Sequence, residues 1–377
     1  MSSNIAFNHK SVLSASFTIF LSIGSLLMLA WVLHGPEISH ANAASVQNVG
    51  TWAVVSSGVP LTYSLNSVAA ASSSDGWAVG STGHDALAYS LGPLILRWNG
   101  NVWSQVLISS TVTGYYDLES VIMVSANDAW AVGGDDGSSE SFGATLHWDG
   151  HTWNKMAAGL SYLKSLAAVS ASDVWAVGGY AKQRSYPYQS YYGRGTIHWN
   201  GTSWGVEQII NDEFGSGLNS VAMVSTDDGW AVGWISGSNM ILHWDGSAWT
   251  RVSSPVFQTV QMLTSVAMVS TDDGWAVGMG GTILHWDGIS WSQAISPVSQ
   301  RLNSITMLSA NEGWVVGDSG TILHWDGNTW SQGSSPVTQT LKSVTMISAN
   351  EGWAVGLEGT ILHYTNFHRL YLPLVVR

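Results

Sequence analysis

The sequence predicts an all-β fold, a seven-bladed β-propeller of four-stranded antiparallel blades. The first observation behind this prediction is a repeated element, written WAVG in most copies. Its tryptophan recurs at Trp77, Trp130, Trp175, Trp230, Trp275, Trp314 and Trp353. The second is the spacing of 53, 45, 55, 45, 39 and 39 residues between these tryptophans, because a period of about 40 with several short strands is typical of propellers. The third is that no segment after the N-terminal region shows the 3.6-residue apolar period of a helix.

Each repeat divides into four short strands. In the copy from Leu302 to Trp330, the first strand reads LNSITMLS, the second GWVVG and the third GTILHW. The fourth begins at the tryptophan that follows an Asp-Gly turn. These runs are rich in β-branched and aromatic residues and are bounded by Gly, Asp and Asn, as strands are.

Two polar turns punctuate the repeats. The turn between the third and fourth strands carries Asn or Asp followed by Gly, a pair that favours the two positive φ angles of a type I′ turn. Its members are Asn99-Gly100, Asp149-Gly150, Asn200-Gly201, Asp245-Gly246, Asp287-Gly288 and Asp326-Gly327. The turn between the first and second strands uses the same polar residue types, as in Asp227-Asp228-Gly229, Asp272-Asp273-Gly274 and Asn350-Glu351-Gly352.

Tryptophans at three positions of the repeat supply the predicted core. Besides the WAVG residue, one ends the third strand and one begins the fourth. These are Trp98, Trp148, Trp199, Trp244, Trp286 and Trp325, and Trp103, Trp153, Trp204, Trp249, Trp291 and Trp330. A buried indole hides about 150–250 Å², which contributes about 4–6 kcal/mol before the entropy of folding is counted. One blade cannot cover both of its own faces, so the blades are expected to stack on one another.

The two ends of the repeat region are expected to meet. The segment from Asn48 to Pro60 matches the fourth-strand segment from Asn328 to Val337, and the last repeat stops after GTILHY without a fourth strand. We therefore expect Thr51 to Ser56 to form the outer strand of the seventh blade, which removes an exposed sheet edge. The apolar tail from Arg369 to Arg377 is the alternative.

The composition excludes one class of partner. Of the 377 residues, 10% are charged, and the net charge is −13. No basic stripe is present to bind a phosphate backbone, so nucleic acid is not expected as a partner. The chain has no cysteine, so the core must hold the fold without disulfides. We expect residues 44–366 to form one propeller domain. We also expect the protein to be a monomer.

Residues 1–43 read as a signal peptide or an N-terminal membrane anchor. Lys10 precedes an apolar stretch over residues 12–33, and Ala41-Asn42-Ala43 offers a small-residue cleavage site. The apolar stretch is also long enough to span a bilayer. The propeller is therefore expected to be secreted or extracytoplasmic, anchored through residues 12–33 if the segment is not cleaved. Residues 367–377 are expected to form a C-terminal tail or an extra strand.

The repeat GWAVG…GTILHWDGxxW resembles those of the photosystem II assembly factors of the Ycf48 and Hcf136 type, within the wider BNR/Asp-box propellers that include sialidases. The resemblance runs from about Val49 to Tyr364. It implies a β-propeller and an assembly or scaffolding role. Assembly factors of that family present arginines to their client protein, whereas the long loops here carry tyrosine and acidic residues.

Histidines recur at one position of the third strand, and Arg97 takes their place in the first repeat. They are His147, His198, His243, His285, His324 and His363. Because each blade contributes only one, no two are expected to share a metal ion, whose bonds to nitrogen are about 2.0–2.1 Å long. We expect each to be a structural residue that bonds a turn or a neighbouring hydroxyl. No metal and no cofactor are predicted.

Two further motifs read as turns rather than as sites. Gly317-Asp318-Ser319-Gly320 imitates the nucleophile segment of serine proteases, but its counterparts are Gly278-Met279-Gly280-Gly281 and Gly356-Leu357-Glu358-Gly359. The Asp-Asp pairs of the fourth and fifth repeats offer oxygens to calcium, and we expect them to stabilise turns instead.

The alternative function is a glycoside hydrolase of the sialidase type, using acidic residues near the centre of the ring. Such an enzyme needs three arginines that converge on the substrate carboxylate. Only Arg301 lies beside the start of a first strand. The first strands otherwise carry mostly Asn, Ser, Thr and apolar residues, so no catalytic residue is predicted.

The loops between the second and third strands vary most in length. Trp275 and Trp286 are 11 positions apart, whereas the corresponding pairs of the first three repeats are 21, 18 and 24 apart. In a propeller these loops share a face with the connections between blades, and loops on a rigid scaffold often bind partners.

Tyrosine in such loops offers a large contact area at low entropic cost. The candidate binding residues are Tyr180, Arg184, Tyr186, Tyr188, Tyr191, Tyr192 and Arg194 in the third repeat and Asp135, Asp136 and Glu140 in the second. We expect an exported, non-enzymatic binding or scaffold module whose protein or glycan partner meets this face.

Overall fold

The computed structural model describes residues 50–83, 92–108, 116–134, 143–157, 159–160, 162–183, 190–210, 216–255 and 262–366, the side chains of 180–183, 190–193 and 210 excepted. These residues belong to one compact unit, Asn48–Arg377, which is distinct from the unit Met1–Gln47. The predicted targeting segment and the C-terminal tail lie outside the described residues. In the described part, no helix is long and apolar enough to cross a membrane.

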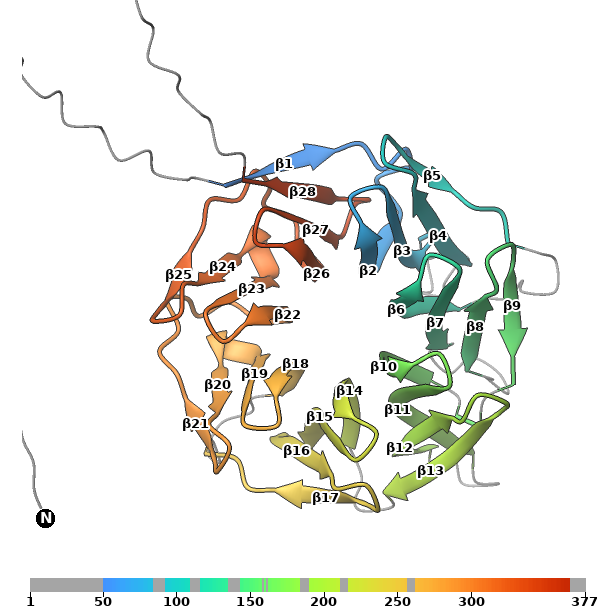
Figure 1. Cartoon of the computed structure of the whole chain (residues 1–377), viewed down its shortest axis with the longest axis vertical. Coiled ribbons are helices and arrows are strands. Elements are labelled where there is room, and N and C mark those ends of the chain that lie inside the picture. The colour runs from blue at the N-terminus through green and yellow to red at the C-terminus, as the bar shows by residue number, and fades with distance from the viewer. Residues whose placement is uncertain are drawn as a thin grey trace, which may run out of the picture. The chain divides into compact units, whose positions relative to one another are not determined.

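The described strands form seven four-stranded antiparallel blades arranged in a ring (Figure 1). Blade 1 contains β2 (Ser64–Ser72), β3 (Asp75–Ser81), β4 (Pro93–Trp98) and β5 (Trp103–Gln105), and blade 2 contains β6 (Asp117–Ser125), β7 (Asp128–Gly134), β8 (Ala144–Trp148) and β9 (Trp153–Met156). Blade 3 contains β10 (Tyr162–Ser170), β11 (Asp173–Gln183), β12 (Ser190–Trp199) and β13 (Trp204–Ile210), and blade 4 contains β14 (Ser216–Ser225), β15 (Asp228–Ile235), β16 (Ser238–Trp244) and β17 (Trp249–Val252).

Blades 5 to 7 follow the same order from the centre outwards. Blade 5 contains β18 (Leu263–Ser270), β19 (Asp273–Gly278), β20 (Ile283–Trp286) and β21 (Trp291–Gln293), and blade 6 contains β22 (Leu302–Ser309), β23 (Glu312–Gly317), β24 (Ile322–Trp325) and β25 (Trp330–Gln332). Blade 7 contains β26 (Leu341–Ser348), β27 (Glu351–Gly356), β28 (Ile361–Thr365) and β1 (Thr51–Val55). A single pair of residues, Tyr162 and Gly134, links blades 2 and 3 into one continuous sheet. The predicted fold class is confirmed.

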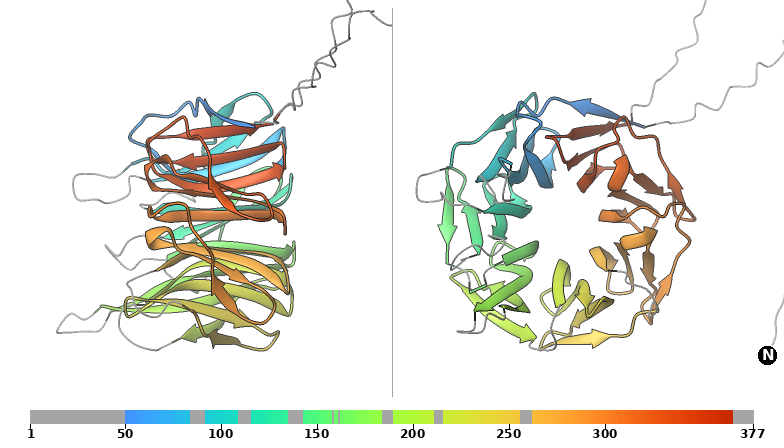
Figure 2. Two further views of the ribbon diagram at one scale, coloured as in Figure 1. Left: turned by 90° about the vertical axis from the view of Figure 1, so that its left-hand side faces the viewer. Right: turned by 180° about the vertical axis from the view of Figure 1, so that it is seen from behind.

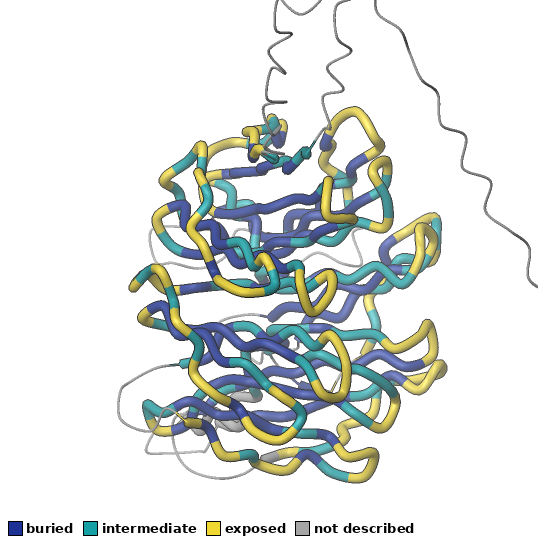
Figure 3. Tube along the Cα trace, turned by 60° about the vertical axis from the view of Figure 1, so that its left-hand side comes forward, coloured by how far each residue is buried: buried dark blue, intermediate teal, exposed yellow. Residues whose placement is uncertain are grey.

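The blades pack through tryptophan. The WAVG tryptophan of each blade lies between two rings of the next blade, with ring centroids 4.7–5.7 Å apart. Trp77 contacts Trp148 and Trp153 in this way, and Trp353 contacts Trp98 and Trp103 across the closure of the ring. All seven WAVG indoles are at most 5% exposed. The buried strands and the exposed turns at their two ends alternate along the trace in Figure 3.

A second ring of contacts is polar. Near the start of each innermost strand, the serine of a recurring Leu-x-Ser segment accepts a hydrogen bond from a backbone N–H of the next blade, at 3.1–3.3 Å. The pairs are Ser67–Val121, Ser120–Leu166, Ser165–Val221, Ser220–Val266, Ser265–Ile305, Ser304–Val344 and Ser343–Val68. These N–H groups point away from the second strand, where no further strand of the same blade follows. The serine hydroxyl therefore provides the acceptor that each N–H group needs.

The ring closes as predicted. β1 pairs antiparallel with β28, and Trp52 lies opposite Tyr364. The Trp52 indole is 8% exposed and contacts both Trp314 and Tyr364. The fourth strand of blade 7 therefore comes from the N-terminal side of the repeats.

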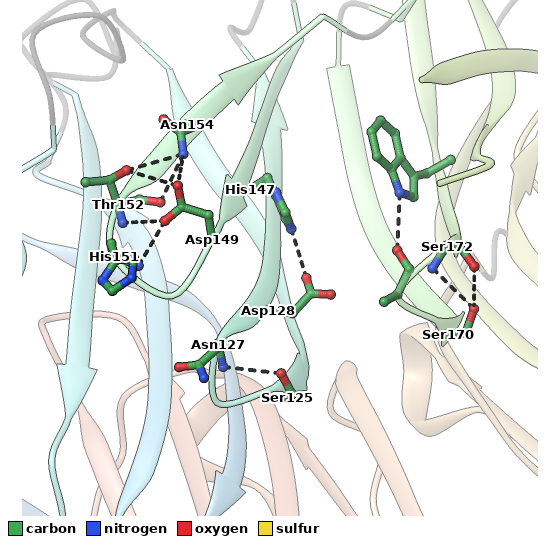
Figure 4. A network of polar contacts seen from close by, with 12 residues as sticks. Ser125, Asn127, Asp128, His147, Asp149, His151, Thr152, Asn154, Ser170 and Ser172 are labelled. Carbon is green, nitrogen blue, oxygen red and sulfur yellow. Dashed lines mark hydrogen bonds and ion pairs between the residues drawn. The ribbon is translucent and has the colours of Figure 1, made fainter. Parts of the chain in front are cut away.

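The prediction of type I′ turns between the third and fourth strands is wrong. Their glycines have positive φ, for example 91° at Gly150, but no Asn or Asp of these turns does. Instead, Asp149 Oδ1 accepts hydrogen bonds from the N–H groups of His151 and Thr152 at 2.9 and 2.8 Å (Figure 4). The result is a four-residue loop with a single positive φ angle, at the glycine. Hydrogen bonds to the side-chain oxygen of the Asp or Asn stabilise this loop.

Candidate binding site at the centre of the loop face

The turns of the ring divide between two faces. Because the strands are antiparallel, the connections between blades emerge with the turns between second and third strands, and we call this side the loop face. Hydrogen bonds confirm the grouping: Gly359 donates to the carbonyl of Tyr63 at 2.8 Å, and Asp318 donates to the carbonyl of Arg301 at 2.9 Å. The opposite side, the turn face, carries the remaining turns, and Figure 2 shows the ring edge-on between the two.

Most of the predicted binding residues fall where the structure gives no side-chain description. Asp135, Asp136, Glu140, Arg184, Tyr186 and Tyr188 lie outside the described residues. Tyr180, Tyr191 and Tyr192 are described as backbone only. They belong to β11 and β12, where Tyr180 pairs with Gly193, Tyr192 with Ala181 and Tyr191 with Lys182.

The insertion of the third repeat, expected to be a loop between the second and third strands, is in part a continuation of β11 and β12. Its flanks extend the β11–β12 hairpin through Gln183 and Ser190, because the ladder of backbone hydrogen bonds continues into the insertion. Arg194 lies in β12 and is 1% exposed. Its guanidinium is thus part of the packed blade rather than of a solvent-facing loop.

The structure adds a site that the loops did not indicate. It is formed by the second residue of each conserved Leu-x-Ser segment, at the start of the innermost strands, where the loop face meets the axis of the ring. In four blades this residue is short and donates a hydrogen bond to a leucine carbonyl of the next blade, at 2.6–3.0 Å. The pairs are Asn66–Leu118, Asn219–Leu263, Thr264–Leu302 and Asn303–Leu341.

In the other three blades the same position is charged, as Glu119, Lys164 and Lys342. Glu119 Oε1 accepts hydrogen bonds from the Tyr162 hydroxyl at 2.6 Å and from Lys164 Nζ at 2.7 Å. Lys164 Nζ also donates to the Tyr162 hydroxyl at 2.6 Å and lies 4.3 Å from the centroid of its ring. With Arg301 and Asp318, these residues form what we call the axial cluster: Glu119, Tyr162, Lys164, Arg301, Asp318 and Lys342.

Charges in the axial cluster shift one another's protonation. Burial alone would raise the pKa of Glu119, but the Lys164 ammonium and the hydrogen bonds from Lys164 and Tyr162 hold it below its usual value. Burial lowers the pKa of Lys342, and the positive charges of Arg301 and Lys164 lower it further, against the opposing effect of Glu119 and Asp318. Perturbed groups gathered in one place are typical of functional sites.

The sequence analysis missed this cluster because it considered the overall composition of the innermost strands and not each position separately. Most of their residues are indeed Asn, Ser, Thr or apolar. The available signal was narrower: across the repeats, the residue between Leu and Ser is charged only in blades 2, 3 and 7.

The recurring histidines lie away from this site, towards the turn face, and are structural as predicted. Their partner is a carboxylate where the turn between the first and second strands leads into the second strand, so they bond a turn residue, as expected, and not a hydroxyl. The pairs, at 2.8–3.2 Å, are His147–Asp128, His198–Asp173, His243–Asp228, His285–Asp273, His324–Glu312 and His363–Glu351. Each imidazole also packs on the WAVG tryptophan of its own blade, as His147 does on Trp130 with centroids 4.1 Å apart. Figure 4 shows the His147–Asp128 pair.

Metal and sialidase-type sites find no support in the described residues. No group of three His, Asp or Glu side chains there could hold a metal ion. Arg97 is bound to Asp75 at 2.6 Å and covers Trp77, and Arg251 lies in the outer strand β17. With Arg194 buried in β12, the described arginines do not gather around Arg301.

Seven four-stranded blades closed by an N-terminal strand define a seven-bladed β-propeller. Solved structures agree with this class. The chain is similar to YCF48 bound to D1 peptide, with 17% identity and a TM-score of 0.59 over 84% of this chain and 95% of that chain. It is also similar to YCF48 from Cyanidioschyzon merolae, with 15% identity and a TM-score of 0.58 over 83% of this chain and 98% of that chain.

A third similar structure is the WD40 β-propeller domain of Doa1, with 12% identity and a TM-score of 0.62 over 85% of this chain and 98% of that chain. The predicted structural resemblance to Ycf48-type propellers is confirmed, and at these identities it establishes the fold. The sequence matches no protein-family model and no curated protein.

Proposed function

We propose that this chain is an exported, non-enzymatic scaffold that binds a protein partner on the loop face. One observation carries the proposal: the turns that vary in length and the charged axial cluster lie on the same face of a ring whose blades are otherwise alike. The turns between second and third strands have four residues in blades 5 to 7, such as Met279–Thr282 and Asp318–Thr321, but are expanded in blades 1 to 3. The same face carries the axial cluster.

Position supports the proposal further. Blades 1 to 3 are neighbours, so the strand ends that carry their insertions lie next to one another on the loop face. Glu119 and Lys164 of the axial cluster come from blades 2 and 3, beside that part. A propeller of this fold, YCF48, is known in a complex with D1 peptide, which favours a protein partner over a glycan. Export rests on the composition of residues 1–43, with their apolar stretch and Ala41-Asn42-Ala43.

The binding face is tested by removing the longest insertion. Replacing Gly179–Gly195 with the Met-Gly-Gly-Thr of blade 5 (Met279–Thr282) shortens blade 3 to the tight-turn pattern. The matched control is Ile289→Ser, which changes a side chain that is 87% exposed on the turn face. Proteins cross-linked to the full chain in extracts are then quantified for each variant. We expect the principal partner to be lost with the shortened blade and kept with Ile289→Ser.

Two results would contradict the proposal. One is a partner retained equally by both variants, which would place binding elsewhere. The other is turnover of a fluorogenic glycoside by the purified chain, which would make the glycoside hydrolase the better description. Export is checked separately by fractionation and N-terminal sequencing, with the mature chain expected to begin after Ala43.

A further inference from the structure

Lys342 lacks the hydrogen bond between blades that other residues make at its position in the repeat. It is the second residue of β26, where blades 1, 4, 5 and 6 carry an Asn or Thr that fastens the next blade. Lys342 makes no such bond, and within the described residues its ammonium has no hydrogen-bond or ion-pair partner. Its side chain is nevertheless half-buried. An ammonium that no protein group pairs takes its hydrogen bonds from solvent or from a ligand.

The carboxylates near Lys342 are already engaged. Glu119 Oε1 is held by Tyr162 and Lys164, and Asp318 Oδ1 accepts a hydrogen bond from Asn303 Nδ2 at 3.0 Å. Arg301, immediately before β22, adds an exposed positive charge close enough to perturb Lys342. The axial cluster thus holds three positive groups against two carboxylates, in a chain whose net charge is −13.

We infer that the centre of the loop face is an oxyanion site, in which Lys342, supported by the charges of Arg301 and Lys164 in the same axial cluster, receives a carboxylate or phosphate group. An oxyanion supplies the charge-assisted hydrogen bonds that the Lys342 ammonium lacks. The lowered pKa of Lys342 agrees with this assignment, since an anion beside the ammonium would favour the charged form again. The group is carried either by a free small anion or by an acidic side chain of a protein partner.

The test uses the full chain with inorganic phosphate and citrate, titrated by calorimetry at low ionic strength, where charge interactions are least screened. The key variant is Lys342→Asn, because asparagine at this position fastens the next blade in blades 1, 4 and 6 and should preserve folding. The control is Lys155→Gln, an exposed lysine of the outer strand β9. We expect both anions to bind the native chain, Lys342→Asn to weaken binding at least tenfold, and Lys155→Gln to leave it unchanged.

A second arm distinguishes the two sources of the anion. A ten-residue glutamate-rich peptide is compared with the same peptide carrying glutamine. Stronger binding of the glutamate peptide than of phosphate, lost in Lys342→Asn, assigns the group to a partner side chain, and binding of small anions alone assigns it to a free anion.

The inference is overturned if neither anion nor the glutamate peptide binds the native chain. It is equally overturned if Lys342→Asn, shown to be folded by its tryptophan fluorescence, binds all of them unchanged. Because the phosphate arm requires no partner, its result is independent of the function proposed above.

Discussion

At the scale of single residues, most polar side chains of this chain serve the backbone. The aspartates of the turns between third and fourth strands illustrate this. Hydrogen bonds from the N–H groups of Thr152 and His151 lower the pKa of Asp149 to about 2. The Ser247 hydroxyl, followed by the N–H groups of Ala248 and Ser247, lowers the pKa of Asp245 to about 2. Each ionised carboxylate therefore stabilises its turn.

A pH dependence follows from these two residues. In the unfolded chain an aspartate titrates at about 3.9, so its folded-state pKa is the lower one. The stabilisation is present above the unfolded value and is lost as the pH falls from about 4 through about 2. The double variant Asp149→Asn/Asp245→Asn keeps both side-chain oxygens but does not titrate. We expect its urea midpoint, followed by tryptophan fluorescence, to fall less over this interval than that of the native chain.

The converse substitution provides the control. Asn99 holds the equivalent turn of blade 1 by accepting the N–H groups of Asn101 and Val102 at 3.0 Å each. Asn99→Asp introduces a titrating group into the same geometry and should steepen the acid dependence. Identical profiles for all three proteins would mean that these carboxylates are not coupled to folding.

At the scale of the element, the last residue of each WAVG element, in the second strand of the blade, is a glycine for a steric reason. A Cβ atom on Gly317 would overlap the carbonyl oxygen of Arg301, the residue just before β22. The pairing of β22 with β23 is irregular at this point, between Leu302 and Ser304. The same overlap recurs in all seven blades, which explains the last letter of the repeated WAVG element.

Gly317→Ala isolates this steric effect. The φ of Gly317 is −160°, which any residue adopts, so only the overlap opposes a methyl group. Overpacking of this kind costs about 1–3 kcal/mol, measured as a loss of free energy of unfolding. Gly333→Ala is the matched control in the same blade, because the nearest atoms lie 3.9 Å from the point that its methyl carbon would occupy, and the substitution should be nearly neutral. Equal stability of the two variants would refute the steric account.

At the scale of the whole molecule, each blade is stabilised by its two neighbours. The WAVG tryptophan of one blade lies between two aromatic rings of the next, and each such ring pair adds about 0.5–1.5 kcal/mol beyond its burial. The pattern passes from Trp353 of blade 7 to Trp98 and Trp103 of blade 1 without interruption. No blade is terminal, so none needs a capping repeat.

The sequence predicts this architecture well because the same contacts recur in every repeat. Trp52 aligns in sequence with the tryptophans that begin the fourth strands, and this alignment even predicts which segment completes blade 7. The axial cluster was not predictable in the same way. Glu119, Lys164 and Lys342 are far apart in the chain, and only the closed ring brings them together around the axis. The prediction of type I′ turns was wrong for a local reason, because the aspartate side chain competes with the backbone for the same N–H groups.

Closure itself can be tested with one pair of variants. Trp52→Ala and Trp153→Ala remove equivalent fourth-strand indoles, 8% and 3% exposed, and a large cavity of this kind costs about 3–5 kcal/mol. Trp153 lies in a blade whose four strands are consecutive, whereas β1 joins blade 7 only through its pairing with β28. We therefore expect hydrogen exchange to show a selective loss of amide protection along β28 in Trp52→Ala but not in Trp153→Ala. If β28 is protected equally in both variants, the N-terminal strand is not what holds the ring shut.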